Sequence, residues 1–168
     1  MHAGTYLYLL FIPLGVSTMA ATPDKASDYM KPLLSYAASY IPKAKHKETP
    51  LYILCTAGMR VLPESQQSAI LQDLVKDVPQ EYDFLFSEAH AEVISGKQEG
   101  VYAWISINFV LGRFDHVVDD EDAVVAVTVG TQEDAIIRKR TVGIIDMGGG
   151  SLQIAYEVPK TMTFPSAE

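Results

Sequence analysis

The spacing of apolar residues along the first half of the chain switches between a helical period and short strand-like runs. Residues 64–78 (ESQQSAILQDLVKDV) repeat apolar positions every three or four residues, which predicts an amphipathic helix with one buried side. A second helix is expected to start at Thr22, a residue type that caps helices well, and to be kinked at Pro32. Between the two helices, residues 50–58 (PLYILCTAG) predict a short buried strand that ends in a glycine turn.

The second half of the chain repeats this alternation. Residues 97–114 (KQEGVYAWISINFVLGRF) are apolar on most sides, so we expect a largely buried helix closed by Gly112. Short strands are expected at 84–86, 91–94, 124–129, 140–146 and 151–158. Alternating helices and strands predict a mixed α/β domain, in which 52–55 and 141–146 are expected to be strands of one mixed sheet.

The N-terminal segment contains an apolar run with more than one interpretation. Residues 6–16 (YLYLLFIPLGV) form an apolar run of signal-peptide length, but the positive charge that normally precedes such a run is missing. The run is also too short to predict a membrane span by itself, so a signal peptide, an anchor and a buried strand all stay open. We expect the chain to divide into a signal-like or replaced segment 1–21, a folded part 22–160 and a short tail 161–168.

Composition and charge exclude several classes of protein. The chain has 168 residues, 48% of them hydrophobic, and a net charge of −8, which argues against a nucleic-acid partner because phosphate backbones are bound by clustered basic residues. Its single cysteine, Cys55, excludes an internal disulfide. The acidic residues 119–122 lack the ligand spacing of a calcium-binding EF-hand and predict a solvated loop.

Glycine and polar residues meet at three places where a strand is expected to stop or turn, namely 55–60 (CTAGMR), 94–100 (ISGKQEG) and 146–153 (DMGGGSLQ). Glycine lets backbone N–H groups converge on an anion, as in phosphate-binding loops. A carboxylate such as Asp146 would repel phosphate there unless a divalent cation lay between them, directly or through water. Each junction alone is explained by an ordinary turn, but the three together indicate a phosphate site.

The same segments resemble a known family. LYILCTAGMRVL, ISGKQEGVYAWISINFVLGRF and DMGGGSLQIAYEVP are similar to the second, third and fourth conserved regions of the apyrase or ectonucleoside triphosphate diphosphohydrolase family, in family order. The wording AKHKETPLYILCTAGMR most resembles the endomembrane Golgi and lysosomal branch, which is associated with nucleoside diphosphates such as UDP. The resemblance implies the actin and sugar-kinase type of fold, with two ribonuclease-H-like lobes. This chain would supply most of one lobe, an incomplete mixed sheet flanked by helices.

The resemblance also implies residue roles. Glu99 matches the catalytic glutamate, although from the sequence alone it is equally an acidic residue beside a helix start. Asp146 would orient waters on Ca²⁺ or Mg²⁺, and Arg60 would either stabilise phosphate charge or brace its loop. The phosphate-binding residues would be Thr56, Ala57, Gly58, Gly148, Gly149 and Gly150, and the water-positioning residues Ser151 and Gln153.

The sequence departs from the family pattern at two positions of the fourth region. The family commonly has alanine where this chain has Gly150, and threonine where it has Leu152. We expect Gly150 to keep its backbone donor and Leu152 to point into the core.

The function expected from this resemblance is metal-dependent hydrolysis of nucleoside di- and triphosphates, such as UDP and GDP, by water attack on the terminal phosphate. The first conserved region has no counterpart before Thr22, and the fifth region would lie beyond Glu168, which is typical of a fragment or truncated isoform. The alternative is therefore a catalytically inactive isoform that binds phosphate or regulates a full-length partner. An exopolyphosphatase relative is a third reading, because DxGGGS resembles that family too. The expected location is the secretory pathway, in the Golgi or lysosomal lumen or membrane.

Overall fold

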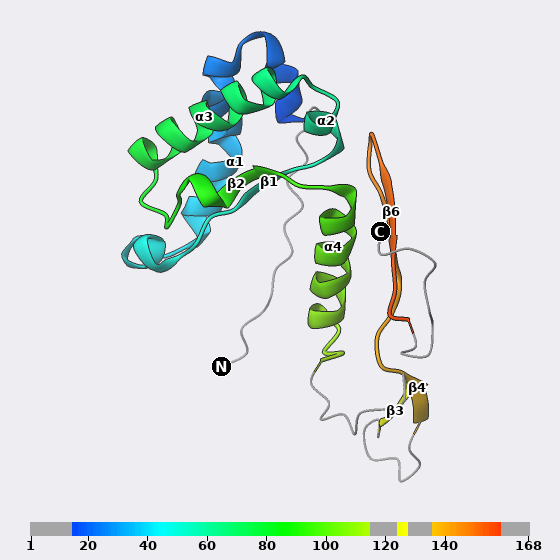
Figure 1. Cartoon of the computed structure of the whole chain (residues 1–168). Helices are drawn as coiled ribbons and strands as arrows, with labels where there is room; N and C mark the ends of the chain where they lie inside the picture. The colour runs from blue at the N-terminus through cyan, green and yellow to red at the C-terminus, as the bar shows by residue number, and fades with distance from the viewer. Residues whose placement is uncertain (1–14, 115–123, 128–135, 159–168) are drawn as a thin grey trace. The chain divides into compact units, whose positions relative to one another are not determined.

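The computed structural model describes residues 15–114, 124–127 and 136–158, and the chain divides into two compact units, Met1–Ile94 and Ser95–Glu168. Each unit combines helices with short two-stranded sheets, as Figure 1 shows, which confirms the mixed α/β class. The helices are α1 Ala26–Tyr40, α2 Ala57–Arg60, α3 Glu64–Glu81 and α4 Gly96–Val110, and the 3₁₀ helices are η1 Val16–Ala21, η2 Pro23–Lys25, η3 Lys43–Glu48 and η4 Glu88–His90. The strands are β1 Ile53–Cys55, β2 Ala91–Val93, β3 Val124–Val127, β4 Ile136–Lys139, β5 Ile144–Met147 and β6 Leu152–Ala155.

The core of the first unit lies between α1, α3 and the parallel pair β1–β2. The helix predicted from residues 64–78 is confirmed as α3, and its residues Ile70, Leu74 and Val78 are buried at the helical spacing that the sequence indicated. They pack in one cluster with Leu34 of α1 and Ile53 of β1. The apolar face of α3 therefore contributes three of the buried side chains that stabilise this unit.

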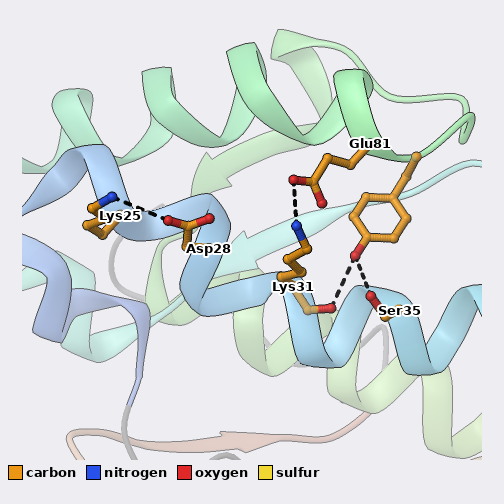
Figure 2. A network of polar contacts seen from close by, with 6 residues as sticks. Lys25, Asp28, Lys31, Ser35 and Glu81 are labelled. Carbon is orange, nitrogen blue, oxygen red and sulfur yellow. Dashed lines mark hydrogen bonds and ion pairs between the residues drawn. The ribbon is translucent and has the colours of Figure 1, made fainter.

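Polar contacts also join α1 to α3, as Figure 2 shows. The ammonium of Lys31 lies 2.8 Å from a carboxylate oxygen of Glu81, which raises the pKa of Lys31. The hydroxyl of Tyr82, just after α3, hydrogen-bonds with Ser35 Oγ at 2.6 Å and donates to the Lys31 carbonyl at 3.1 Å. These contacts are solvent-exposed and add orientation more than energy.

The start of the first helix differs from the expectation. Thr22 makes no side-chain cap; it precedes η2, and α1 begins only at Ala26. The backbone N–H of Ser27 is instead satisfied by Asp73 Oδ2 of α3, at 2.8 Å. A tertiary contact thus replaces the local cap, and α1 continues through Pro32.

The ordered structure begins before Thr22. Val16 and Met19 of η1 pack against the core of the first unit. A Cβ atom placed on Gly58 would lie 2.7 Å from Ser17 Oγ, so η1 also approaches α2 closely. Within the described residues, no helix is both long enough and apolar enough to cross a membrane. Most of the apolar run 6–16 lies outside the described residues.

In the second unit, α4 packs against the antiparallel hairpin β5–β6. The hairpin loop is closed by a hydrogen bond of 3.0 Å from Gly148 N to the Ser151 carbonyl. At its open end, Arg140 forms an ion pair with Glu157, and Thr141 Oγ1 donates to the same carboxylate at 2.7 Å. A second antiparallel pair, β3–β4, completes the described part of this unit.

The helix end predicted at Gly112 is confirmed. Gly112 has φ 62°, and its N–H donates to the Phe109 carbonyl at 2.9 Å, while Arg113 N donates to the Asn108 carbonyl at 2.8 Å. This pair of bonds is a Schellman motif, which needs a left-handed residue that glycine adopts without strain.

Two expectations about the sheets and α4 were wrong. Strands β1 and β5 do not share a sheet: β1 pairs with β2, and β5 pairs with β6 across a short turn, where loop closure costs little entropy. Helix α4 is not largely buried, because a two-stranded hairpin covers only one side of it. Its buried residues are Gly100 and Asn108, while Val101, Tyr102, Ile105, Ile107, Phe109 and Val110 are exposed.

Leu152 does not point into a core either, since it is 56% exposed. Alternation along β6 places Gln153 and Leu152 on opposite faces, and Gln153 takes the buried one. The acidic loop expected at 119–122 lies outside the described residues.

Candidate functional site

The first group of predicted site residues lies where β1 runs into α2. Thr56 precedes α2, and its carbonyl accepts from Met59 N at 3.0 Å and Arg60 N at 3.2 Å. The glycine turn expected after β1 is therefore a short helical turn. A Cβ atom on residue 58 would meet the Ser17 hydroxyl of η1, so a larger residue than Gly58 would require that hydroxyl to turn away.

Arg60 makes a bracing contact in this unit. Its Nη1 donates to the Ile94 carbonyl at 2.9 Å, and the Ile94 N–H donates to the Cys55 carbonyl, also at 2.9 Å. The end of β2 is thus tied to the end of β1 and to α2. The backbone around Thr56 is held in place by these bonds.

The second group begins at the start of α4. Ser95 caps this helix: its hydroxyl accepts from Gln98 N at 3.2 Å, and Gln98 Oε1 accepts from Ser95 N at 2.9 Å. This reciprocal capping box satisfies backbone donors that would otherwise be unpaired. Glu99 lies in the first turn, with its N–H donated to the Ser95 carbonyl at 3.0 Å.

Gln153 is packed against that helix start. The residue is 8% exposed, its Nε2 donates to Ser151 Oγ at 2.7 Å, and its Oε1 has no protein partner within the described structure. A Cβ atom placed on Gly100 would lie 3.3 Å from Gln153 Cβ, and one on Gly96 would lie 3.6 Å from Gln153 Nε2. The two glycines therefore let α4 approach the amide closely.

Asp146 lies directly opposite Gln153 in the hairpin register. In an antiparallel pair, directly opposed residues point to the same face, so Asp146, Gln153 and the start of α4 belong to one side of the hairpin. The unpartnered Oε1 of Gln153 makes this side a candidate site, since a buried amide oxygen normally has a partner.

The glycine loop 148–150 is exposed. None of its three glycines has a positive φ, and a Cβ atom placed on Gly149 would meet nothing within 4 Å. Neither backbone strain nor packing within the described structure therefore requires glycine at 149. Glycine there leaves room for a bound group to approach the backbone.

Sequence reasoning found two groups, and the structure describes each within one unit. Thr56, Ala57, Gly58 and Arg60 lie together in the first unit, while Asp146, Ser151, Gln153 and the helix start that carries Glu99 lie together in the second. The convergence of Thr56 with Glu99 and Asp146 joins the two units and stays a prediction. Sequence reasoning overlooked Asn108, although a polar residue within an apolar helical run was a signal of a buried contact.

Comparison with known proteins gives the wider context. A family model described as the GDA1/CD39 (nucleoside phosphatase) family matches residues 9–168. Ectonucleoside triphosphate diphosphohydrolase 7 of Xenopus tropicalis is 88% identical over 154 residues, which are 92% of this chain and 25% of that protein. Ectonucleoside triphosphate diphosphohydrolase 4 of Homo sapiens is 67% identical over 156 residues, again 92% of this chain and 25% of the relative. Nucleoside-diphosphatase mig-23 of Caenorhabditis elegans is 40% identical over 152 residues, 90% of this chain and 26% of the relative.

The chain thus spans about a quarter of the length of the curated relatives it matches. The three motifs that carry the sequence resemblance all lie within the matched region. Because the family model covers nearly the whole sequence, this chain belongs to the GDA1/CD39 nucleoside phosphatase family.

Proposed function

We propose that this chain forms one wall of the catalytic cleft of a nucleoside di- and triphosphate hydrolase. The observation that carries the proposal is the buried amide of Gln153. Its Oε1 has no protein partner among the described residues. The residue lies opposite Asp146 in the hairpin and packs against the start of α4. A buried acceptor oxygen without a protein partner can accept a hydrogen bond from a bound water or substrate group. Membership of a nucleoside phosphatase family supports nucleotide phosphates as the substrate class.

In the proposed reaction, Ser151 and Gln153 position a water molecule near the terminal phosphate. Their mutual hydrogen bond of 2.7 Å fixes both side chains before substrate arrives. Glu99 accepts a proton as the water oxygen attacks phosphorus, and the bond from phosphorus to the bridging oxygen breaks. Inorganic phosphate and the shortened nucleotide are the products.

The phosphates would be held by backbone N–H groups of Gly148, Gly149 and Gly150 and by Thr56 with Ala57 and Gly58. In an actin-type fold these groups would belong to one lobe, and a second lobe would complete the cleft. The bond from Arg60 to the Ile94 carbonyl supports a bracing role for Arg60 rather than a direct charge contact.

A divalent cation, Ca²⁺ or Mg²⁺, fits this site through water. The described residues contain no group of three or more His, Cys, Asp or Glu side chains that could hold a metal directly. A lone Asp146 carboxylate beside amide and hydroxyl oxygens suits a cation that keeps most of its hydration shell. When bound, the cation would neutralise charge on the phosphates. Its oxygen ligands from this chain would be few, so Asp146 serves mainly to orient its waters.

The relatives' names support nucleotides over polyphosphate as the substrate, and we propose a location in the secretory pathway. A second candidate is a non-catalytic product that binds phosphate or a longer partner protein.

The test is Glu99→Gln in a complete enzyme, built by replacing the matching quarter of the Xenopus relative with this chain. We expect phosphate release from UDP or GDP to fall by about 10²- to 10⁴-fold, because the proton acceptor is lost while size is kept. Nucleotide affinity should stay nearly unchanged. Glu92→Gln makes the same chemical change on exposed β2 and should keep full activity. Undiminished turnover in Glu99→Gln would remove Glu99 as the base.

A further inference from the structure

Among the described residues of the second unit, Asn108 is the most deeply buried polar one, at 0% exposure, and no step of the proposed reaction uses it. It lies near the end of α4, about two and a half turns after Glu99. Its Oδ1 accepts from Val142 N at 2.8 Å, and its Nδ2 donates to the Val142 carbonyl at 3.1 Å. Nδ2 also donates to the Trp104 carbonyl at 2.9 Å within α4. One side chain therefore pairs both backbone groups of Val142, as a neighbouring strand would.

This clamp acts at one end of the interface between α4 and the hairpin. Val142 lies two residues before β5, so Asn108 fixes the end of α4 against the open end of the hairpin. Near the start of α4, the close approach of Gly100 to Gln153 and Ala155 fixes the other end. A rigid helix held at both ends can neither slide nor rotate on the hairpin.

Glu99 is the neighbour of Gly100 in the first turn of α4. Its position relative to Asp146 and Gln153 is therefore set by where α4 lies on the hairpin. We propose that Asn108 is a positioning residue, whose clamp on Val142 holds α4 in the register that places Glu99 for catalysis. The inference rests on the proposed role of Glu99.

The physical reason for an amide at this position is its pair of opposite hydrogen-bonding groups. An apolar residue of similar size would leave the N–H and C=O of the half-buried Val142 without these partners, and the hairpin would have to shift for water to replace both. Small displacements have large effects on catalysis, because the reacting groups must align within a fraction of an ångström. Helix α4 otherwise contacts the hairpin along one side only, and most of its apolar side chains are exposed.

Hydrogen exchange on the 168-residue chain tests the clamp itself. In Asn108→Ser, the shorter side chain reaches fewer of the backbone groups and admits water. We expect the Val142 amide to exchange at least tenfold faster than in the parent chain, while the Gly148 amide at the hairpin loop keeps its protection. Equal protection of Val142 in both chains would show that the clamp is absent.

Kinetics of the complete enzyme then test positioning. Asn108→Leu and the milder Asn108→Ser are each expected to lower kcat by about 10- to 100-fold with KM changed less than about twofold. Glu157→Gln, which weakens the ion pair at the open end of the hairpin, is the matched control for lost stability and should keep kcat. If Asn108→Leu fails to fold, Asn108→Ser gives the answer.

The decisive comparison adds Asn108→Ser to Glu99→Gln. If Asn108 acts through Glu99, the double variant is no slower than Glu99→Gln alone. The side chain at position 99 can then no longer accept a proton, so moving it has no further effect. A further loss of kcat equal to that seen with Glu99 present would overturn the inference and show a purely structural role. Full activity of Glu99→Gln itself would instead contradict the proposed function, so the two failures are distinguishable.

Discussion

Asp146 and Gln153 are directly opposed residues of the β5–β6 hairpin, so a carboxylate and an amide share one face of it. The amide is buried against α4 and bonded to Ser151, while the neighbouring residue Leu152 is exposed on the other face. The hairpin therefore separates a polar face, beside the helix start that carries Glu99, from an apolar one. Substitutions at the adjacent positions 152 and 153 should therefore have very different effects on activity.

Gln153→Ala should abolish most of the hydrolysis of nucleoside diphosphates by the complete enzyme, whereas Leu152→Thr should leave it nearly intact. The first change removes both the bond to Ser151 and the unpartnered Oε1. Loss of a positioned donor costs about 10²- to 10³-fold in kcat in comparable sites. Steady-state phosphate release by the two variants measures the difference. Similar rates for both would show that the polar face is not the reactive one.

Arg60→Met should destabilise the first unit by about 1 kcal/mol, because the buried Ile94 carbonyl loses a charged donor. Urea unfolding of the 168-residue chain measures this loss. If Arg60 only braces its loop, the fall in kcat of the complete enzyme follows the fall in folded fraction. A loss of about a hundredfold or more in kcat without loss of stability would mean that Arg60 contacts the phosphates directly.

Because of Cys55, the first unit should lose stability as the pH rises into the alkaline range. Burial disfavours the thiolate and raises the pKa of Cys55 from 9.0 to about 11. The unfolded chain therefore loses this proton first as pH rises, so the contribution of the thiol is fully present below pH 9.0 and is lost between there and about 11. The free energy of unfolding should fall by about 1.4 kcal/mol per pH unit in that window.

Urea unfolding of the parent chain and of Cys55→Ala at several alkaline pH values separates this slope from the titration of lysine and tyrosine. The alanine variant should be less stable near neutrality, because it leaves a small cavity, but it should lack the extra slope. Parallel pH curves for the two chains would contradict a buried thiol.

The 168-residue chain by itself should release phosphate from UDP, GDP or ATP at the background rate, with either Ca²⁺ or Mg²⁺ present. One wall of a cleft leaves the phosphates in water, where each hydrogen-bond donor stabilises charge less than in an enclosed site. Exposed apolar residues on α4 and on the outer face of the hairpin also predict low solubility without a partner. Metal-dependent release well above background, lost in Glu99→Gln, would show that the chain is a working enzyme.

Much of this protein was determined by local sequence. The apolar period of residues 64–78 predicted α3, and Gly112 marked the end of α4, because helix amphipathicity and left-handed glycine ends depend on neighbours in the chain. The glycine loop was placed between two strands by the same local logic. The family motifs supplied the proposed role of Glu99, which spacing alone did not distinguish from that of an acidic residue near a helix start.

Only the tertiary structure decided which faces are buried and which distant groups meet. Asp73 replaces a local cap at the start of α1, and Asn108 supplies partners for Val142, although the local sequence names the partner in neither case. Leu152 is exposed and Gln153 buried, against the hydrophobicity of both side chains, because α4 covers the polar face of the hairpin. Such choices depend on contacts between residues far apart in sequence, and those contacts exist only once the chain has folded.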